Sequence, residues 1–144
     1  MTRAVVVEDS GVRFVQNISV GHHLFQADEP VEVGGSDAGA DPYELLLAAL
    51  GACISITLRM YADRKQWPLE GVQVRLGFAR MHAEDCAMCD DETRMVDGIE
   101  VEVSAVGDLS EDQHRRLMEI AERCPVHRTL SSPIPIRTRL TQRA

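Results

Sequence analysis

Residues 41–53 read Asp-Pro-Tyr-Glu-Leu-Leu-Leu-Ala-Ala-Leu-Gly-Ala-Cys, and this stretch has the pattern of a buried helix with a well-formed start. Asp41 is a good N-cap, Pro42 fits the first helical position, and Glu44 stands three residues after the cap. No residue in the range Leu45–Ile54 is charged or strongly polar. A helix that is apolar on every side is buried on every side, so we expect a central core helix.

We expect this central helix to run to about Lys65, because basic residues are typical of a helix C-terminus. Six short strands and one other helix are too little to cover such an apolar helix within one chain. An intertwined dimer that shares its central helices would cover it. The helix carries one cysteine, Cys53.

Length and composition limit the class of protein. With 144 residues, we expect one domain over residues 1–144. The net charge of −8 argues against nucleic acid and anionic membranes as partners. The longest uncharged apolar run is about ten residues, too short to span a bilayer, and the N-terminus lacks a signal-peptide core. We therefore expect a cytoplasmic protein, in which the four cysteines are reduced, catalytic or metal-binding.

The remaining elements follow from apolar periodicity and from glycine and proline positions. A second helix is expected to begin at Ser110, which forms a capping box with Gln113. Strands are expected over residues 4–7, 11–20, 22–28, 72–83, 95–106 and 132–142. The resulting order, βββ–α–ββ–α–β, indicates an α+β fold built from antiparallel sheets.

The second helix carries an apolar stripe that ends in another cysteine. The residues at i, i+3, i+4 and i+7 are Leu117, Ile120, Ala121 and Cys124. Pro125 disfavours helical geometry at Cys124 and can itself begin a new turn. Cys124 would then lie at a helix N-terminus, where the dipole lowers the pKa of a thiol, and His127 and Arg128 would act in the same direction.

Two interpretations of Cys53 and Cys124 remain open at this point. Both cysteines lie on apolar helix faces that must share one core, and a free cysteine is most often a small core residue. They can alternatively form a reactive pair, for which Cys53 would need an arginine from elsewhere in the fold. Glu44 has a similar ambiguity: it can orient that arginine, or it can be the return partner of a capping box.

A third candidate site is the pair Cys86 and Cys89, with His82 and Asp85 nearby. Cys-x-x-Cys is half of a zinc site or a redox dithiol, but no second ligand pair stands free. The surrounding residues 84–94 are rich in carboxylates, which raise the pKa of a thiol. The simplest interpretation is a solvated acidic loop with two thiols.

Residues 41–53, together with Arg-Cys-Pro-Val-His-Arg-Thr-Leu at 123–130, resemble the OsmC/Ohr family of osmotically inducible and organic hydroperoxide resistance proteins. The resemblance extends from about Val12 to Thr138. It implies an OsmC-like fold, in which sheets wrap two central helices of an intertwined homodimer. It also implies that Cys53 is the peroxidatic thiol and that Cys124 resolves it through a disulfide.

The resemblance further implies that a dithiol such as dihydrolipoamide on a lipoyl protein regenerates the enzyme, with no bound cofactor or metal. The active-site glutamate of Ohr proteins lies ten residues before the cysteine, where this chain has Tyr43; Glu44 lies nine before Cys53. The family arginine comes from an early strand or loop, for which Arg13 is the nearest candidate. The loop with Cys86 and Cys89 is outside the Ohr pattern.

We therefore expect a thiol-dependent reductase of organic hydroperoxides, with Cys53, Cys124 and Glu44 as catalytic residues. The apolar surroundings of Cys53 favour hydroperoxides with an organic tail. The alternatives are a non-catalytic protein that binds an apolar ligand, and a metal or thiol-exchange role of Cys86 and Cys89.

Overall fold

The computed structural model describes residues 3–82 and 95–141. The chain forms two compact units, residues 1–48 and 49–144. Whether they function as one domain, as the sequence predicts, stays a prediction. The boundary falls within the long helix that residues 41–53 were expected to begin.

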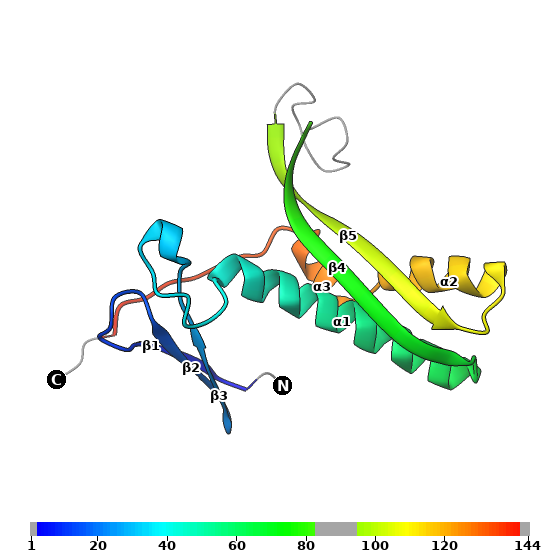
Figure 1. The fold of residues 1–144 in the computed structure, drawn as a ribbon, viewed down its shortest axis with the longest axis horizontal. Helices are drawn as coiled ribbons and strands as arrows, with labels where there is room; N and C mark the ends of the chain where they lie inside the picture. Colours follow the sequence, from blue (N-terminus) through cyan, green and yellow to red (C-terminus); the bar gives the residue numbers. More distant parts are fainter. Residues whose placement is uncertain (1–2, 83–94, 142–144) are drawn as a thin grey trace. The chain divides into compact units, whose positions relative to one another are not determined.

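The first unit contains a three-stranded antiparallel sheet in the order β1-β2-β3 (Figure 1). A tight turn at Gly21, with φ of 60°, joins β2 to β3 and fixes the pairing of Val20 with His23. The predicted second strand is shorter than expected, because residues 11–15 form a turn in which Arg13 adopts a positive φ of 45°. The elements are β1 (Val5–Asp9), β2 (Gln16–Val20), β3 (His23–Ala27) and a short 3₁₀ helix, η1 (Val31–Val33).

The central helix α1 covers Pro42–Lys65, as predicted. Its start is a reciprocal cap: Asp41 Oδ1 accepts a hydrogen bond from the Glu44 backbone N–H at 2.8 Å. In return, Glu44 Oε2 accepts one from the Asp41 backbone N–H, also at 2.8 Å. The capping-box interpretation of Glu44 is therefore confirmed.

Within the single chain α1 is not buried on every side, in agreement with the expectation that one chain has too few elements to cover it. One face of α1 is buried; it comprises Leu50, Gly51, Ile54, Leu58, Tyr61 and Ala62. Another face leaves Leu46, Ile56 and Met60 exposed at 37%, 59% and 65%. The cause is the number of elements, since one ribbon and two short helices cover only one side of a 24-residue helix.

The expectation that no segment is long enough to cross a bilayer is also corrected. Helix α1 has 24 residues and a mean hydropathy of 1.8 over its most apolar window, which suffices by length and composition. The helix continues past the uncharged stretch at its start, and these additional residues give it enough length to cross a bilayer. The core helix of a soluble protein has the same profile, so the criterion alone does not place α1 in a membrane.

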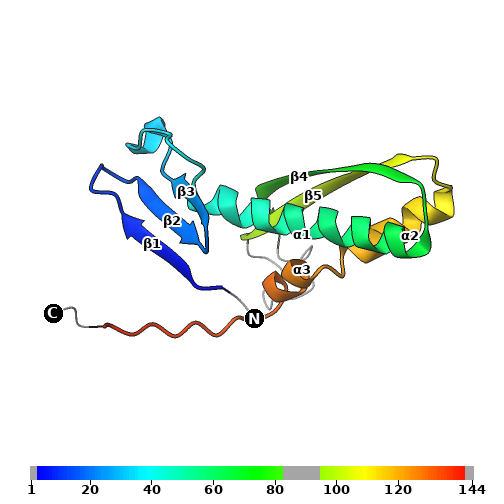
Figure 2. The same cartoon turned by 90° about the horizontal axis from the view of Figure 1, so that it is seen from below.

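In the second unit, a long antiparallel ribbon runs along α1 (Figures 1 and 2). Its strands are β4 (Leu69–His82) and β5 (Met95–Gly107), and the pair is in register at Val74 and Val103. Gly51 lets α1 approach the ribbon closely, because a Cβ there would lie 2.8 Å from Leu76 Cδ1.

Two further helices complete this unit: α2 (Glu111–Ala121) and α3 (Pro125–Leu130). The predicted capping box of Ser110 and Gln113 is present, with both hydrogen bonds formed. The predicted stripe is buried: Leu117, Ile120, Ala121 and Cys124 pack with the buried face of α1 in one core.

The predicted last strand is wrong within the described residues, because residues 132–141 form no strand. A strand needs a neighbour for its backbone hydrogen bonds, and Pro133 and Pro135 offer no N–H. Ile136 and Leu140 are 83% and 94% exposed, so no packing replaces those bonds. The predicted acidic loop over 84–94 lies outside the described residues.

Candidate active site

The second unit brings Cys53 and Cys124 together. Cys53 lies in the middle of α1 and is half-buried, whereas Cys124 follows α2 and is fully buried in the core against which Cys53 packs. The two thiols interact electrostatically, and Cys53 packs against the buried cluster that contains Cys124. The backbone N–H of Val126 also donates to Cys53 Sγ, with 3.5 Å between N and S.

The Cys-Pro pair explains this local geometry. Pro125 is the first residue of α3 and holds Cys124 in an extended conformation, with φ of −63° and ψ of 146°. Cys124 is therefore the N-cap of α3, and its Sγ accepts a hydrogen bond from the His127 backbone N–H at 3.3 Å. One short helix start thus provides N–H groups to both sulfurs.

The pKa of Cys124 is shifted in the direction opposite to that expected. Burial is the largest effect and raises the pKa of this thiol above its ordinary value. The hydrogen bond from the His127 N–H lowers the pKa by less, and the interaction with the Cys53 thiol raises it further. The expectation failed because α3 has only six residues, while the buried sulfur has no exposure to water. Cys124 is therefore a neutral thiol at pH 7.

Glu44 and Arg13 are both engaged within the first unit. The Glu44 carboxylate accepts from the Asp41 N–H, as described above. Arg13 Nε donates to the Gly34 carbonyl oxygen at 2.7 Å, and its guanidinium carbon lies 5.4 Å from the centre of the Phe14 ring. Catalytic roles for Glu44 and Arg13 stay predictions.

Cys86, Cys89 and Asp85 lie outside the described residues. His82 ends β4, and its side chain also lies outside the description. Within residues 3–82 and 95–141, no group of three or more His, Cys, Asp and Glu side chains is placed to hold a metal ion.

Sequence reasoning missed the donors of this site. His127 was considered for the charge of its ring, but its backbone N–H and that of Val126 are the groups that contact the sulfurs. The Cys-Pro pair carried the signal, since proline at the first helical position leaves the next two N–H groups available. It also missed Asp28, a buried carboxylate in the loop before α1.

Comparison with known proteins shows the family and the fold of this chain. The family model described as OsmC-like protein matches residues 34–139. The chain belongs to the OsmC-like family. Among curated proteins, none matches the sequence.

Solved structures of OsmC-like and Ohr proteins share the fold. A putative osmotic stress induced and detoxification response protein from Psychrobacter arcticus is 17% identical, with a TM-score of 0.69 over 90% of this chain and 88% of that one. An organic hydroperoxide resistance protein OsmC from Legionella pneumophila is 19% identical, with a TM-score of 0.64 over 90% and 89%.

A putative organic hydroperoxide resistance protein from Vibrio cholerae, with captopril bound in one of its active sites, is 20% identical. Its TM-score is 0.59 over 90% of this chain and 85% of that one. The OsmC-like α+β fold, with antiparallel sheets and a long central helix, is therefore shown for this chain.

Proposed function

We propose that this OsmC-like protein is a thiol-dependent organic hydroperoxide reductase. The observation that carries the proposal is the contact between Cys53 and Cys124, two free cysteines that lie 71 positions apart in the sequence. Two thiols that interact within one packed cluster are placed for disulfide exchange, which two isolated core cysteines are not.

Exposure assigns the two roles. Cys53 is half-buried, so a peroxide can reach its sulfur, whereas Cys124 is fully buried. The Cys53 thiolate attacks one oxygen of the O–O bond and forms an S–O bond as the O–O bond breaks. The products are Cys53 sulfenic acid and an alkoxide, which takes a proton to become the alcohol.

Cys124 then closes the cycle. Its sulfur attacks the sulfenic sulfur of Cys53, a disulfide forms, and the thiol proton leaves with the hydroxyl group as water. An external dithiol, such as a lipoyl protein, is oxidised to its own disulfide and returns both cysteines to thiols. No bound cofactor takes part in these steps.

The surroundings of Cys53 support an organic hydroperoxide as the substrate. Its neighbours on α1 include Ala49, Leu50, Ala52 and Ile56, which provide apolar contact for an alkyl or aryl tail. The family includes proteins named for organic hydroperoxide resistance, and the Vibrio protein binds captopril in an active site. These relatives support the same chemistry here.

We also propose that the protein is a cytoplasmic homodimer. The exposed face of α1, with Leu46, Ile56 and Met60, is a surface that a second copy would cover. Leaving large apolar side chains in water forgoes about 1.5–3 kcal/mol each.

Turnover tests the proposal. Cumene hydroperoxide should be consumed with dihydrolipoamide as reductant, faster than hydrogen peroxide, because only the former has an apolar tail. Cys53→Ser should abolish the consumption, whereas Ser55→Ala, two residues away on α1, should retain it. Consumption that survives in a folded Cys53→Ser protein would contradict the proposal.

One observation favours a second function, a binding protein without turnover. The Glu44 carboxylate is engaged with the Asp41 N–H in the helix cap, and this leaves it less able to orient an arginine. Such a protein would hold an apolar ligand and would not consume cumene hydroperoxide at all, so the same assay separates the two functions.

A further inference from the structure

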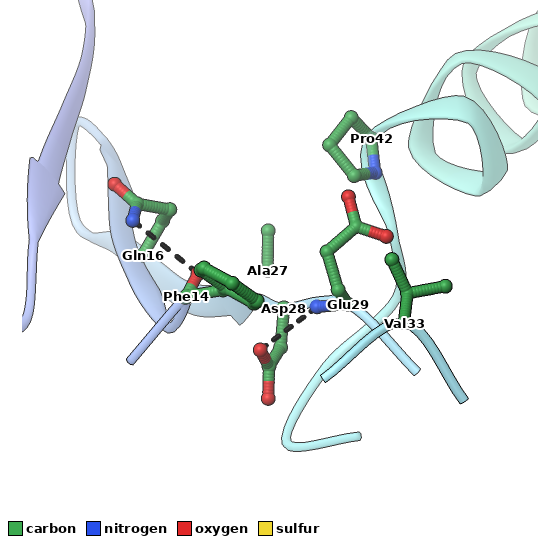
Figure 3. A pocket seen from close by; sticks show the side chains of 7 residues that line it. All are labelled: Phe14, Gln16, Ala27, Asp28, Glu29, Val33 and Pro42. Atoms are coloured by element: carbon green, nitrogen blue, oxygen red, sulfur yellow. Dashed lines mark hydrogen bonds between the residues drawn. The ribbon is translucent and has the colours of Figure 1, made fainter. Parts of the chain in front are cut away.

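The first unit contains a cavity of about 440 Å³, a size in the range of small-molecule sites. Its apolar walls come from the turn before β2, the end of β3, the 3₁₀ helix η1 and the start of α1 (Figure 3). The residues that form these walls are Phe14, Ala27, Val33 and Pro42. The three polar residues at the cavity decide what it can hold.

Strand alternation separates two adjacent carboxylates. Side chains of successive residues in an extended chain point to opposite faces. Figure 3 accordingly shows Ala27 and Glu29 on one side, with the Glu29 carboxylate directed toward Pro42, while Asp28 points the other way. Glu29 is therefore the acid that faces the apolar wall.

Asp28 is fully used by its own loop. Its Oδ2 accepts from the Ser36 N–H, the Ser36 hydroxyl and the Ala38 N–H at 3.0, 2.7 and 3.0 Å, and its Oδ1 accepts from the Glu29 N–H at 2.8 Å. The hydrogen bonds from Ala38 and Ser36, in that order, lower the pKa of Asp28 to about 2. Asp28 is thus charged at neutral pH, but its oxygens already accept four hydrogen bonds from its own loop and are not directed to a ligand.

The loop holds Glu29 on a fixed backbone. The Glu29 carbonyl oxygen accepts from the Asp37 N–H at 3.2 Å. Gly35 packs so closely that a Cβ there would lie 1.9 Å from that same oxygen, and this excludes other residues. A carboxylate on such a backbone is preorganised for a ligand.

Among the polar side chains at the cavity, the only charged group that faces the apolar wall is an acceptor, the Glu29 carboxylate. Gln16 donates one N–H of its Nε2 to the Phe14 carbonyl oxygen at 3.3 Å, so its second N–H and its Oε1 remain. The Glu29 carboxylate has no hydrogen-bond or ion-pair partner among the residues that the structure describes, and it accepts only. A ligand that binds the Glu29 carboxylate must supply the hydrogens.

Charge and aromaticity select the same class of ligand. Asp28 and Glu29 contribute two negative charges, and Arg13, stacked on Phe14 and bonded to Gly34, contributes one positive charge. The net charge of these three side chains is therefore negative. The Phe14 ring also lines the cavity, and an aromatic ring attracts a cation. A metal ion fits poorly, since one free carboxylate is far from a full set of oxygen ligands.

We propose that this cavity binds a small organic cation, a primary ammonium with an aryl or alkyl body. The ammonium group donates to Glu29 and to Gln16 Oε1, and the apolar body packs against Phe14, Val33 and Pro42. Neither cysteine takes part, so the site is independent of the thiol chemistry proposed above.

Three probes with one benzene ring test the proposal on the full chain. Benzylammonium, benzyl alcohol and benzoate are titrated at physiological salt into ¹⁵N-labelled protein while the amide shifts are followed. Benzylammonium should shift the amides of residues 27–33 saturably, the alcohol more weakly, and benzoate not at all. Benzoate binding as tightly as benzylammonium, or no saturable shift with benzylammonium at millimolar concentration, would overturn the proposal.

A matched pair of variants separates the site from general charge attraction. Glu29→Gln and Glu32→Gln each remove one negative charge, but Glu32 lies in η1, is exposed, and does not line the cavity. Glu29→Gln should weaken benzylammonium binding about tenfold, the contribution of one charge-assisted hydrogen bond, while Glu32→Gln leaves it unchanged. Equal effects of the two variants would refute the site.

If Glu29→Gln disturbs the loop, a variant that changes no charge still tests the site. Phe14→Leu keeps an apolar wall and removes the aromatic ring. It should weaken benzylammonium about threefold and benzyl alcohol less, since only the cation interacts with the ring quadrupole. Unchanged benzylammonium affinity in a folded Phe14→Leu protein would count against the proposal.

Discussion

Two isoleucines on α1 offer a matched test of what covers this helix. Ile54 and Ile56 have the same side chain and stand two residues apart, which places them about 160° apart around the helix axis. In the single chain Ile54 is 1% exposed and Ile56 is 59% exposed. Replacing each by alanine removes the same atoms from opposite faces.

The expected cost for Ile54→Ala comes from its complete burial. The substitution removes three buried carbons at about 0.8 kcal/mol each and leaves a cavity, so the free energy of unfolding should fall by about 2–5 kcal/mol. For Ile56 in an isolated chain, two fifths of the side chain is buried, and the same reckoning gives about 1 kcal/mol. A second copy that covers Ile56 would raise this cost to about 2 kcal/mol or more.

Urea unfolding at two protein concentrations, with sedimentation velocity, measures both effects. The proposed homodimer predicts a large cost for both variants, an unfolding midpoint that rises with concentration, and weaker association of Ile56→Ala alone. A compact wild-type monomer at micromolar concentration, with less than about 1 kcal/mol lost in Ile56→Ala, would refute the dimer. A similarly small loss in Ile54→Ala would refute the assignment of the core face.

Three further results are expected. The rate at which Cys53 sulfenic acid converts to the disulfide, followed by stopped-flow, should keep rising with pH beyond the ordinary thiol pKa of about 8.5, because burial raises the pKa of Cys124; a plateau near neutral pH would contradict this. The charge of Asp28 stabilises the fold at pH values above the pKa of this carboxyl in the unfolded chain, and this contribution is lost as the pH falls through its folded pKa of about 2. Asp28→Asn should therefore lower the thermal midpoint at pH 7 and lower it much less at pH 2. Equal losses at both pH values would show that the charge is unimportant. Replacing Cys86 and Cys89 by serine should leave peroxide turnover nearly intact, because the acidic residues near them disfavour thiolates; lost turnover in the folded double variant would place the active site in that loop.

Local chemistry was predictable from the sequence wherever a few adjacent residues decide the structure. The cap at Asp41 and Glu44 and the cap at Ser110 and Gln113 are both present, because each depends on side chains three residues apart. The new helix after Cys124 was predictable for the same reason, since proline restricts its own backbone and that of the residue before it.

Features that depend on distant parts of the fold were predicted less well. Residues 132–141 alternate like a strand, but a strand forms only when a partner strand is available. The apolar composition of α1 indicated burial and could not show which face this chain covers. The pKa of Cys124 was misjudged because helix termini are visible in a sequence, whereas the burial that outweighs them is decided by the core.

Of the predicted catalytic residues, Cys53 and Cys124 lie close to each other. The apolar stripes on their two helices predicted that the two cysteines would share a core. Which backbone groups contact the sulfurs depends on how α3 packs against α1, and no short pattern encodes that contact. Catalytic roles for Glu44 and Arg13 stay predictions. The hydrogen bond of Glu44 is part of the cap of α1, and that of Arg13 lies within its own loop region.

The central claim is that Cys53 reacts with peroxide and Cys124 resolves it, and mass mapping after one equivalent of cumene hydroperoxide tests it most directly. With a sulfenic-acid trap present, wild-type protein should give a disulfide between the tryptic peptides of Cys53 and Cys124. Cys124→Ser should give a trapped adduct on Cys53, and Cys53→Ser should give neither product. Unmodified cysteines in all three proteins would contradict the claim and leave both residues as core packing.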